Sequence, residues 1–401
     1  MVVPDGSNPL TRCGIDTVEI ARIERFLRET DADDLLKIFS REELRDCSEN
    51  GGRVASLAAR FAAKEACLKL FPRETALGTI GPADFAVARD GYGAPQVVCS
   101  PNALFLLDRY RLKRIALSLT HDKTSASAVA VTEPAQVRVP LSGTLMYHLL
   151  PIRRRVVRAN LQRVFGGMVP DAEVTRLAQA HYAHLARLLS EFLTARWRPP
   201  TVRVENMDAI VRAHARGKGV LVLTGHFGNL EVATLGGIAT FPQYRGQFHF
   251  VRRPLRPGWL DRLVTRRFRR AGFGVLPKRG ALDAILDRLS AGDAVVFVLD
   301  QHAGGRDGVT IDFFGHPAGT FRSLAILALA TGAPVVPSAT WREPDGSHVL
   351  RFEEALPVIE HENTNEAIRA NTRAYNAALE RLVLRHPEQW FWVHRRWKPT
   401  P

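Results

Sequence analysis

The stretch Gly219–Glu231, GVLVLTGHFGNLE, constrains the fold of this chain more than any other. Its first half is a short, continuous apolar run that ends near Gly225 and Gly228, and this pattern predicts a buried parallel strand followed by a turn. The residues 229–238 then predict a helix. His226 would lie in a strand-to-helix turn at the carboxyl edge of a sheet, where open α/β folds bind their ligands.

Glu231 follows His226 by five residues, in the first turn of the predicted helix. A carboxylate there can accept a hydrogen bond from one imidazole nitrogen, which leaves the other nitrogen free to take a proton from a hydroxyl. The spacing alone decides little, because other histidines also have an acid five positions on: His302/Asp307, His348/Glu353 and His361/Glu366. For these the sequence favours loop, packing or surface roles. The strand-turn-helix context makes His226 and Glu231 the predicted catalytic pair.

The chain has 401 residues, enough for two domains, and its two parts differ in charge. Residues 1–133 carry 18 Lys or Arg against 19 Asp or Glu, whereas residues 134–401 carry 37 against 22. A basic domain suits nucleic acid or an anionic membrane surface. Because no zinc-finger, RNP-type or helix-turn-helix signature accompanies the arginines, we expect an anionic membrane surface and no nucleic acid. A basic adaptor without catalysis is the alternative.

The sequence contains no apolar run of about 18 or more residues, so it predicts no transmembrane helix. The first ten residues are polar with two prolines and do not resemble a signal peptide. Neither CxxC nor Cys/His ligand spacing occurs, so we expect reduced cysteines at Cys13, Cys47, Cys67 and Cys99. Together these features predict a cytoplasmic protein bound peripherally to the inner face of the plasma membrane.

Further stretches follow the His226 turn in a fixed order: VRRP at 251–254, VVFVLDQH at 295–302, FFGHPAGT at 313–320 and HPEQWFWVHRRWK at 386–398. With that turn they resemble the late acyltransferases of lipid A biosynthesis, over roughly residues 145–399. The resemblance implies an α/β acyltransferase domain over residues 144–401, with a central sheet flanked by helices. It implies transfer of an acyl chain from acyl carrier protein to a hydroxyl of a membrane lipid or glycolipid. Acyl-coenzyme A as the donor stays open.

Several polar residues of this domain are candidates for its site. Arg252 and Arg253 follow a predicted strand and match a family landmark, so we expect them to bind a phosphate-bearing substrate or the developing oxyanion. Arg279 is a further candidate of the same kind. Asp300 ends the buried run 294–299, and we expect it in the site wall, positioning substrate or a basic residue. No G-x-S-x-G motif is present, which favours direct transfer over an acyl-enzyme.

In the first third of the chain, residues 14–28 predict a strand followed by an amphipathic helix, and residues 60–71 predict a second helix. Glu65 and Lys69 are four residues apart on that helix, so they share a face. The segments GIDTVEIAR at 14–22, AAKEACLK at 62–69, GYGAP at 91–95 and LSLTHDK at 117–123 resemble holo-(acyl carrier protein) synthase. The resemblance implies an α+β phosphopantetheinyl transferase domain over residues 12–133, joined by a linker at 134–143.

Synthases of this family transfer 4'-phosphopantetheine from coenzyme A, their substrate, to a serine of the acyl carrier protein. The resemblance assigns Asp16 and Glu65 as ligands of Mg²⁺, which would neutralise charge on the pyrophosphate oxygens. Lys69 and Lys64 would face the phosphates as point charges.

The resemblance places His121 beside the coenzyme A site and Arg22 against the acidic carrier protein. Lone synthases of the family form trimers, so a homo-oligomer through this domain is expected. The chain as a whole would be a bifunctional enzyme. The alternative is an acyltransferase whose N-terminal domain is only a carrier-protein docking module.

Overall fold

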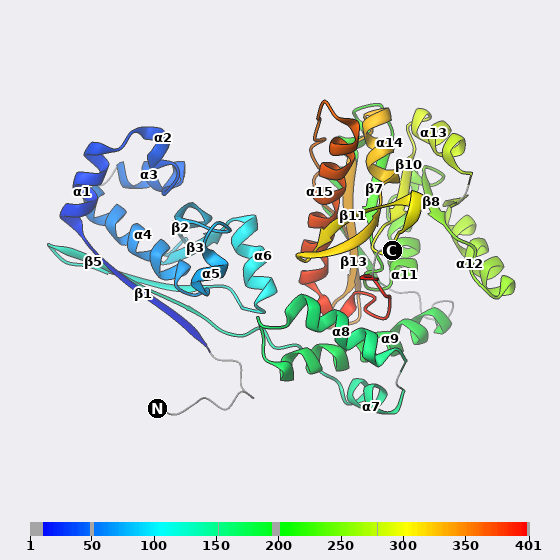
Figure 1. Cartoon of the computed structure of the whole chain (residues 1–401), viewed down its shortest axis with the longest axis horizontal. Helices are drawn as coiled ribbons and strands as arrows, with labels where there is room; N and C mark the ends of the chain where they lie inside the picture. Colours follow the sequence, from blue (N-terminus) through cyan, green and yellow to red (C-terminus); the bar gives the residue numbers. More distant parts are fainter. Residues whose placement is uncertain (1–10, 49–51, 151, 195–200, 279, 399–401) are drawn as a thin grey trace. The chain divides into compact units, whose positions relative to one another are not determined.

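The computed structural model describes residues 11–48, 52–150, 152–194, 201–278 and 280–398 (Figure 1). They form two compact units. The first ends at Gln136 and also contains Phe165–Glu173, and the second contains Val137–Val164 and the residues from Val174 onward. The first unit mixes an antiparallel sheet with helices, and the second has a mostly parallel sheet flanked by helices. The predicted fold class is therefore confirmed.

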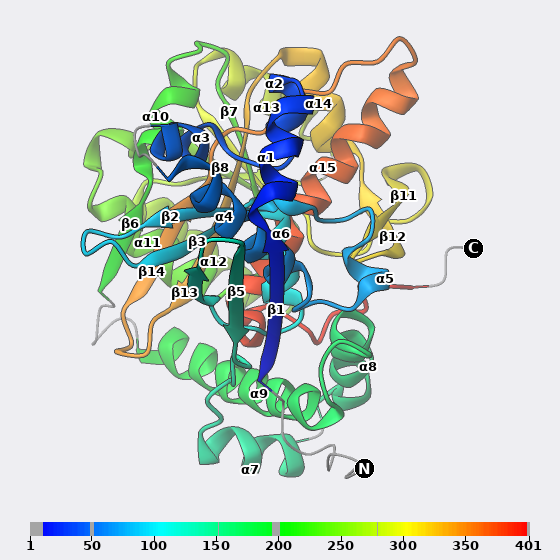
Figure 2. The same ribbon diagram turned by 90° about the vertical axis from the view of Figure 1, so that its left-hand side faces the viewer.

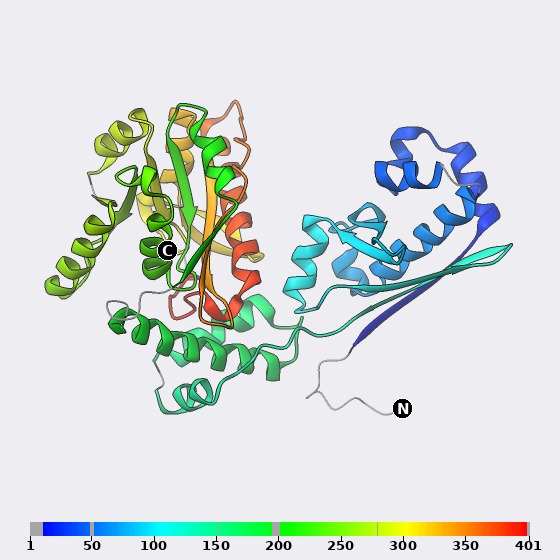
Figure 3. The same ribbon diagram turned by 180° about the vertical axis from the view of Figure 1, so that it is seen from behind.

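The first unit is built on an antiparallel sheet in the order β1-β5-β4. Figure 2 shows β1 and β5 side by side. Helix α4 lies directly on this sheet, beside β1 (Figure 3). A Cβ at Gly14 of β1 would lie 2.0 Å from the carbonyl oxygen of Ala66, so only glycine allows this approach. The elements are β1 (Arg12–Glu19), α1 (Ile20–Glu29), α2 (Ala32–Leu35), α3 (Arg41–Ser48), α4 (Arg53–Leu68), α5 (Arg73–Ala76), β2 (Phe85–Arg89), β3 (Pro95–Cys99), α6 (Pro101–Arg109), β4 (Ala116–His121) and β5 (Ser125–Thr132).

The second unit contains a seven-stranded sheet in the order β6-β14-β13-β7-β10-β8-β9. Neighbouring strands from β13 to β9 are parallel, and the antiparallel pairing of β13 with β14 reverses the direction at one edge. A separate hairpin, β11 with β12, follows β10. The strands are β6 (Val202–Glu205), β7 (Val220–Thr224), β8 (Phe248–Arg252), β9 (Gly274–Pro277), β10 (Ala294–Val298), β11 (Gly308–Phe313), β12 (His316–Phe321), β13 (Val335–Arg342) and β14 (His348–Phe352).

Helices cover both faces of this sheet, because right-handed crossovers in opposite directions lie on opposite faces. Helices α10 (Met207–His214), α11 (Leu230–Ala239) and α12 (Gly258–Ala271) pack on the face that carries Val220 and Val222. Helices α13 (Leu282–Ser290) and α14 (Ser323–Thr331) precede β10 and β13 in the chain. Helix α15 (Thr364–Arg385) follows β14 and packs against α14, β11 and β13. The sheet is therefore buried on both sides, as the continuous apolar runs of β7 and β10 predict.

Three helices precede the sheet in the chain: α7 (Leu141–Leu149), α8 (Arg154–Phe165) and α9 (Asp171–Thr194). Helix α7 begins inside the segment 134–143 that was expected to be a linker. Among the described residues, no helix is both long and apolar enough to cross a bilayer.

Candidate active sites

The turn after β7 holds His226 at the carboxyl edge of the sheet. Gly228 in this turn has a φ of 49°, and a Cβ there would lie 2.6 Å from the carbonyl oxygen of Thr340. The turn therefore needs glycine both for its backbone conformation and for its contact with β13. Asn229 then caps helix α11, because its side chain accepts a hydrogen bond from the backbone N–H of Val232 at 3.2 Å.

Asp300 is the residue that holds the His226 imidazole. The Nδ1 of His226 lies 2.7 Å from Oδ1 of Asp300, and the backbone N–H of His226 donates to Oδ2 at 2.7 Å. These residues are 74 positions apart but meet because β7 and β10 are paired in parallel with Thr224 opposite Val298. Each site residue lies two positions beyond its strand's last residue, so the register brings them together.

The charges of this pair favour a base at His226. Burial lowers the pKa of the imidazole, but the charge of Asp300 and the hydrogen bond to it outweigh burial, so the pKa is raised. Burial alone would raise the pKa of Asp300, but the charge of His226 and several N–H donors hold it at about 2. A carboxylate only accepts, so Nδ1 carries the hydrogen and Nε2 the lone pair. The imidazole side chain is 38 % exposed, and the side-chain amide nitrogen of Gln301 lies 3.5 Å from its Nε2.

Glu231 does not accept the hydrogen bond from His226 that the five-residue spacing predicts. Its carboxylate instead lies 3.5 Å from Nη1 of Arg267 on α12. Burial raises the pKa of Glu231, while Arg267 and Arg252 act in the opposite direction. The local prediction was wrong about the partner because the turn directs the imidazole toward β10, whereas the first turn of α11 directs Glu231 toward α12. Asp300 was expected to position substrate or a basic residue, and it contacts the basic residue His226.

Two predicted substrate-binding arginines lie near the same edge but in different surroundings. Arg252 donates to Asp261 at 2.7 Å and to Thr265 at 2.9 Å, so its guanidinium braces the start of α12. Arg253 lines a cavity of about 580 Å³ together with Lys278 and Arg322, and with apolar walls from Phe297 and other residues. The third candidate, Arg279, lies outside the described residues.

In the first unit, Asp16, Glu65 and Lys69 come together where α4 crosses β1. The Nζ of Lys69 donates to Oδ1 of Asp16 at 2.7 Å and to the carbonyl oxygen of Ile15 at 2.8 Å. Burial raises the pKa of Glu65, and the negative charge of Asp16 raises it further, while Lys69 and Arg22 act in the opposite direction. Two carboxylates and a lysine therefore share one small charged site, with the exposed Arg22 within electrostatic reach.

Lys64 lies away from this site, and its predicted contact with phosphate was wrong. Its side chain is fully buried and donates to Glu43 at 2.9 Å and to the carbonyl oxygen of Phe85 at 2.8 Å. A weaker contact joins it to the carbonyl oxygen of Pro82 at 3.4 Å. These partners use the three donors of the ammonium, so Lys64 ties α4 to α3 and β2 and has no free donor for a substrate.

His121, at the end of β4, borders a cavity of about 290 Å³ that Arg60, Arg89 and Ser118 also line. Asp16, Glu65 and Lys69 do not line this cavity, and His121 is exposed there. Within the described residues, no group of three or more His, Cys, Asp or Glu side chains could hold a metal ion.

Residues 134–399 match the family described as bacterial lipid A biosynthesis acyltransferase, and residues 12–130 match the 4'-phosphopantetheinyl transferase superfamily. The holo-[acyl-carrier-protein] synthase of Treponema denticola is 43% identical over 121 residues, which cover 30% of this chain and 95% of that protein. The chain belongs to both families. It is a fusion of a synthase unit with an acyltransferase unit, as both resemblances predict.

Relatives of the acyltransferase unit differ in the lipid that their names specify. The lipid A biosynthesis palmitoleoyltransferase of Escherichia coli is 27% identical over 274 residues, covering 65% of this chain and 83% of that protein. The phosphatidylinositol mannoside acyltransferase of Mycobacterium tuberculosis is 27% identical over 262 residues, covering 60% of this chain and 76% of that protein. The similarity therefore spans acyltransferases of two different glycolipids.

The C-terminal motif of the acyltransferase unit, residues 386–398, contributes residues to the site that the sequence analysis did not predict. Trp390 is 2 % exposed, and its indole N–H donates to Oδ2 of Asp300 at 2.8 Å. The backbone N–H of Phe391 donates to the carbonyl oxygen of His226 at 3.1 Å. Burial lowers the pKa of His394 to about 4, and this imidazole lies within electrostatic reach of Asp300 and His226. The motif therefore fixes both members of the pair.

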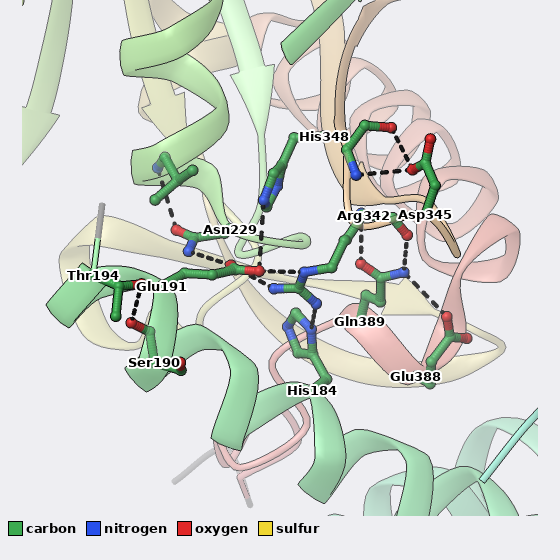
Figure 4. A network of polar contacts seen from close by, with 12 residues as sticks. His184, Ser190, Glu191, Thr194, Asn229, Arg342, Asp345, His348, Glu388 and Gln389 are labelled. Carbon is green, nitrogen blue, oxygen red and sulfur yellow. Dashed lines mark hydrogen bonds and ion pairs between the residues drawn. The ribbon is translucent and has the colours of Figure 1, made fainter. Parts of the chain in front are cut away.

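A buried polar network holds the same turn through Asn229 (Figure 4). Arg342 of β13 donates to both carboxylate oxygens of Glu191 on α9, at 2.6 Å through Nη2 and also through Nε. Asn229, the cap of α11, donates to Glu191 at 2.9 Å. His348 and His184 complete the network at 3.6 Å from Glu191 and 3.3 Å from Arg342. The turn that holds His226 is thus tied to α9 and β13, and no local pattern in the sequence indicates this long-range network.

Proposed function

We propose that the acyltransferase unit transfers an acyl chain from acyl carrier protein to a hydroxyl of a membrane lipid or glycolipid, with His226 as the general base. The observation that carries this proposal is the pairing of His226 with Asp300 at the carboxyl edge of a parallel sheet. Family membership supports the class of reaction. The two glycolipids named for the relatives support a glycolipid or lipid acceptor.

In the proposed reaction, Nε2 of His226 takes the proton from the acceptor hydroxyl as its oxygen attacks the thioester carbonyl carbon. The tetrahedral intermediate then collapses, the carbon–sulfur bond breaks, and the imidazolium returns its proton to the leaving thiolate. Asp300 supports this cycle because its negative charge stabilises the imidazolium and its hydrogen bond to Nδ1 keeps the lone pair on Nε2. Glu231 would contribute through Arg267 rather than through the imidazole.

Two cavities near this pair differ in size and lining. The apolar one, between α11 and the sheet, is lined by Leu230, Val222, Phe250, Val296 and similar residues and measures about 50 Å³, much less than the roughly 300 Å³ or more of a typical ligand pocket. The larger cavity with Arg253, Lys278 and Arg322 suits a phosphate-bearing group. Burial and the charge of Arg253 lower the pKa of Lys278 to about 8. The two cationic side chains are therefore close enough to bind one phosphate together.

For the synthase unit we propose transfer of 4'-phosphopantetheine from coenzyme A to a serine of the apo carrier protein. The serine oxygen attacks the phosphorus that carries pantetheine, and 3',5'-ADP leaves. Asp16 and Glu65 fit Mg²⁺, because each carboxylate disfavours the charge of the other and a divalent cation would relieve that repulsion. When bound, Mg²⁺ neutralises charge on the pyrophosphate oxygens. Lys69 would add a cation, His121 would border coenzyme A, and Arg22 would meet the carrier protein.

We further propose that the protein acts at the cytoplasmic face of the plasma membrane, on an anionic surface that its basic residues 134–401 favour. A trimer through the synthase unit stays a prediction. Sedimentation of the full chain at several concentrations tests it, and a monomer at every concentration would contradict it.

The decisive experiment measures both reactions on variants of the full chain. His226→Ala should abolish acyl transfer and leave pantetheinylation of an apo carrier intact, and Asp16→Ala should do the reverse. Mass spectrometry of the carrier protein and of the lipid products reads out each reaction separately. If the wild-type chain adds no mass to the apo carrier in the presence of coenzyme A and Mg²⁺, the synthase unit is a docking module instead.

A further inference from the structure

Helix α7 packs on α9 through one narrow face. A Cβ on Gly143 would lie 2.5 Å from the carbonyl oxygen of Gln179 and 2.9 Å from Cβ of Ala183, so the two helix backbones touch there. One turn later Tyr147 is 4 % exposed, and its ring centroid lies 5.6 Å from that of Tyr182. Gly143 and Tyr147 therefore define the inner face of α7.

The opposite face of α7 carries an apolar stripe that no described residue covers. Leu141, Leu145 and Leu149 recur every four residues and lie two positions, or about 200°, from the inner-face residues. They are 90 %, 59 % and 66 % exposed. A surface helix normally turns its apolar stripe toward the core, so α7 has the reverse orientation.

Directly after the helix, Leu150 and Ile152 are also apolar and exposed, at 45 % and 56 %. We call these five residues, Leu141, Leu145, Leu149, Leu150 and Ile152, the α7 surface. The chain then enters α8 with exposed cations at Arg155 and Arg158. Arg154 fixes this basic segment next to α7, because it donates to the carbonyl oxygen of Tyr147 at 3.1 Å and lies over its ring.

An exposed apolar stripe beside a cluster of cations is typical of helices that lie in the interface of an anionic bilayer. We propose that the α7 surface docks on such a bilayer, with the leucines among the headgroups and Arg155 and Arg158 against lipid phosphates. This inference rests on the proposed function, since an enzyme that acylates membrane lipids must reach them, and it specifies which surface does so. Charge complementarity favours lipid over a second copy of the chain, because two α7 surfaces would bring like charges together.

Helix α9 links the α7 surface to the catalytic turn. Ala183 contacts α7, and Glu191, eight residues or about 12 Å further along the helix axis, holds Asn229 at the start of α11. Docking through α7 would therefore bring the bilayer close to the His226 turn, where the acceptor hydroxyl is needed.

The test is flotation of the full chain with vesicles of phosphatidylglycerol and phosphatidylcholine, and with vesicles of phosphatidylcholine alone. We expect Leu145→Asp/Leu149→Asp to lower partitioning into anionic vesicles by about 10-fold or more. Leu77→Asp is the matched control, since Leu77 of the synthase unit is 67 % exposed, and it should bind as the wild type does. Arg155→Gln/Arg158→Gln should weaken binding by about 5-fold per residue at low salt and much less at high salt.

Unchanged vesicle binding by the double leucine variant would overturn the proposal. So would a change in the oligomeric state of that variant, which would assign the α7 surface to a second copy, or a raised KM for acyl carrier protein, which would assign it to that partner. Wild-type protein that acylates detergent-dispersed lipid but does not float with vesicles would overturn docking alone. Wild-type protein that floats but transfers no acyl chain would overturn the proposed function and leave docking in place.

Discussion

Asp300→Asn separates the role of Asp300 from that of Glu231, because it keeps the size of the side chain and removes one acceptor. Three N–H groups point at the carboxylate: His226 Nδ1–H at 2.7 Å, the backbone N–H of His226 at 2.7 Å and the indole of Trp390 at 2.8 Å. An asparagine has a single oxygen, so it can face either the imidazole or the other two donors.

The two orientations of the amide differ in free energy by an amount that follows from these contacts. With its oxygen toward the backbone and Trp390, the amide N–H₂ meets Nδ1, and the imidazole must carry its hydrogen on Nε2, where it cannot act as a base. In the reverse orientation the amide N–H₂ faces the backbone N–H of His226 and the indole N–H of Trp390. Each of these buried donors then lacks an acceptor, which costs ~1–3 kcal/mol. The inactive tautomer is therefore favoured by ~2–6 kcal/mol, and we expect a ~30- to 10⁴-fold loss of kcat.

The assay is acyl transfer from labelled acyl carrier protein to a dispersed lipid acceptor, with kcat/KM measured against pH. The base must be neutral, and Asp300 raises the pKa of His226. The wild-type rate should therefore rise with pH through a value above the usual imidazole range. In Asp300→Asn the negative charge is gone and burial dominates, so the remaining activity should have its inflection at lower pH. Glu231→Gln is the control, and its inflection should stay close to that of the wild type.

An Asp300→Asn variant that keeps the wild-type rate and pH profile would refute this reasoning, provided that thermal unfolding shows an intact fold. Complete loss of transfer in Glu231→Gln with a shifted inflection would assign the imidazole to Glu231 after all. The two variants thus show whether the imidazole depends on Glu231, its neighbour in the sequence, or on Asp300, its neighbour in the structure.

Three further outcomes are expected. Lys69→Met should lower pantetheinylation by about 10²-fold, measured by the mass of the carrier, and leave acyl transfer unchanged, because Lys69 would lose its charge beside the pyrophosphate. Lys64→Met should cost ~3–5 kcal/mol of unfolding free energy in urea, because it orphans the buried Glu43, and adding Glu43→Gln should recover part of the loss. Arg342→Lys should cost ~1–3 kcal/mol, since lysine cannot make both bonds to Glu191, and a lower melting temperature would report it.

Much of the fold follows from patterns that are local in the sequence. The apolar runs of β7 and β10 predict buried strands, and the glycines after β7 predict its turn. What the sequence cannot supply is strand register, which decides that Thr224 lies opposite Val298 and hence that His226 meets Asp300. Both residues were recognised as members of the site, but their partnership depends on a pairing across 74 positions.

The error at Lys64 has the same origin. Lys64 lies on α4 and Lys69 is the residue that caps its end, and both look suited to phosphate because both are charged. Five residues correspond to about 500°, so the two side chains leave the helix about 140° apart. One meets Asp16 at the surface, and the other meets Glu43, 21 positions away, in the core. A buried lysine is stable only with such a partner, and a distant partner leaves no mark on the local pattern.

The position of Glu231 suggests why a carboxylate five residues after the histidine is useful even without touching it. In the first turn of α11 its charge is favoured by the helix dipole. Its partner Arg267 belongs to α12, and its neighbour Arg252 is the last residue of β8. Glu231 therefore joins α11 to α12 at the edge of the sheet where the substrates would bind. Loss of this carboxylate would remove a negative charge near the place proposed for the phosphate-bearing substrate. Its substitution should consequently change KM more than the pKa of the base, whereas substitution of Asp300 should change the pKa and kcat.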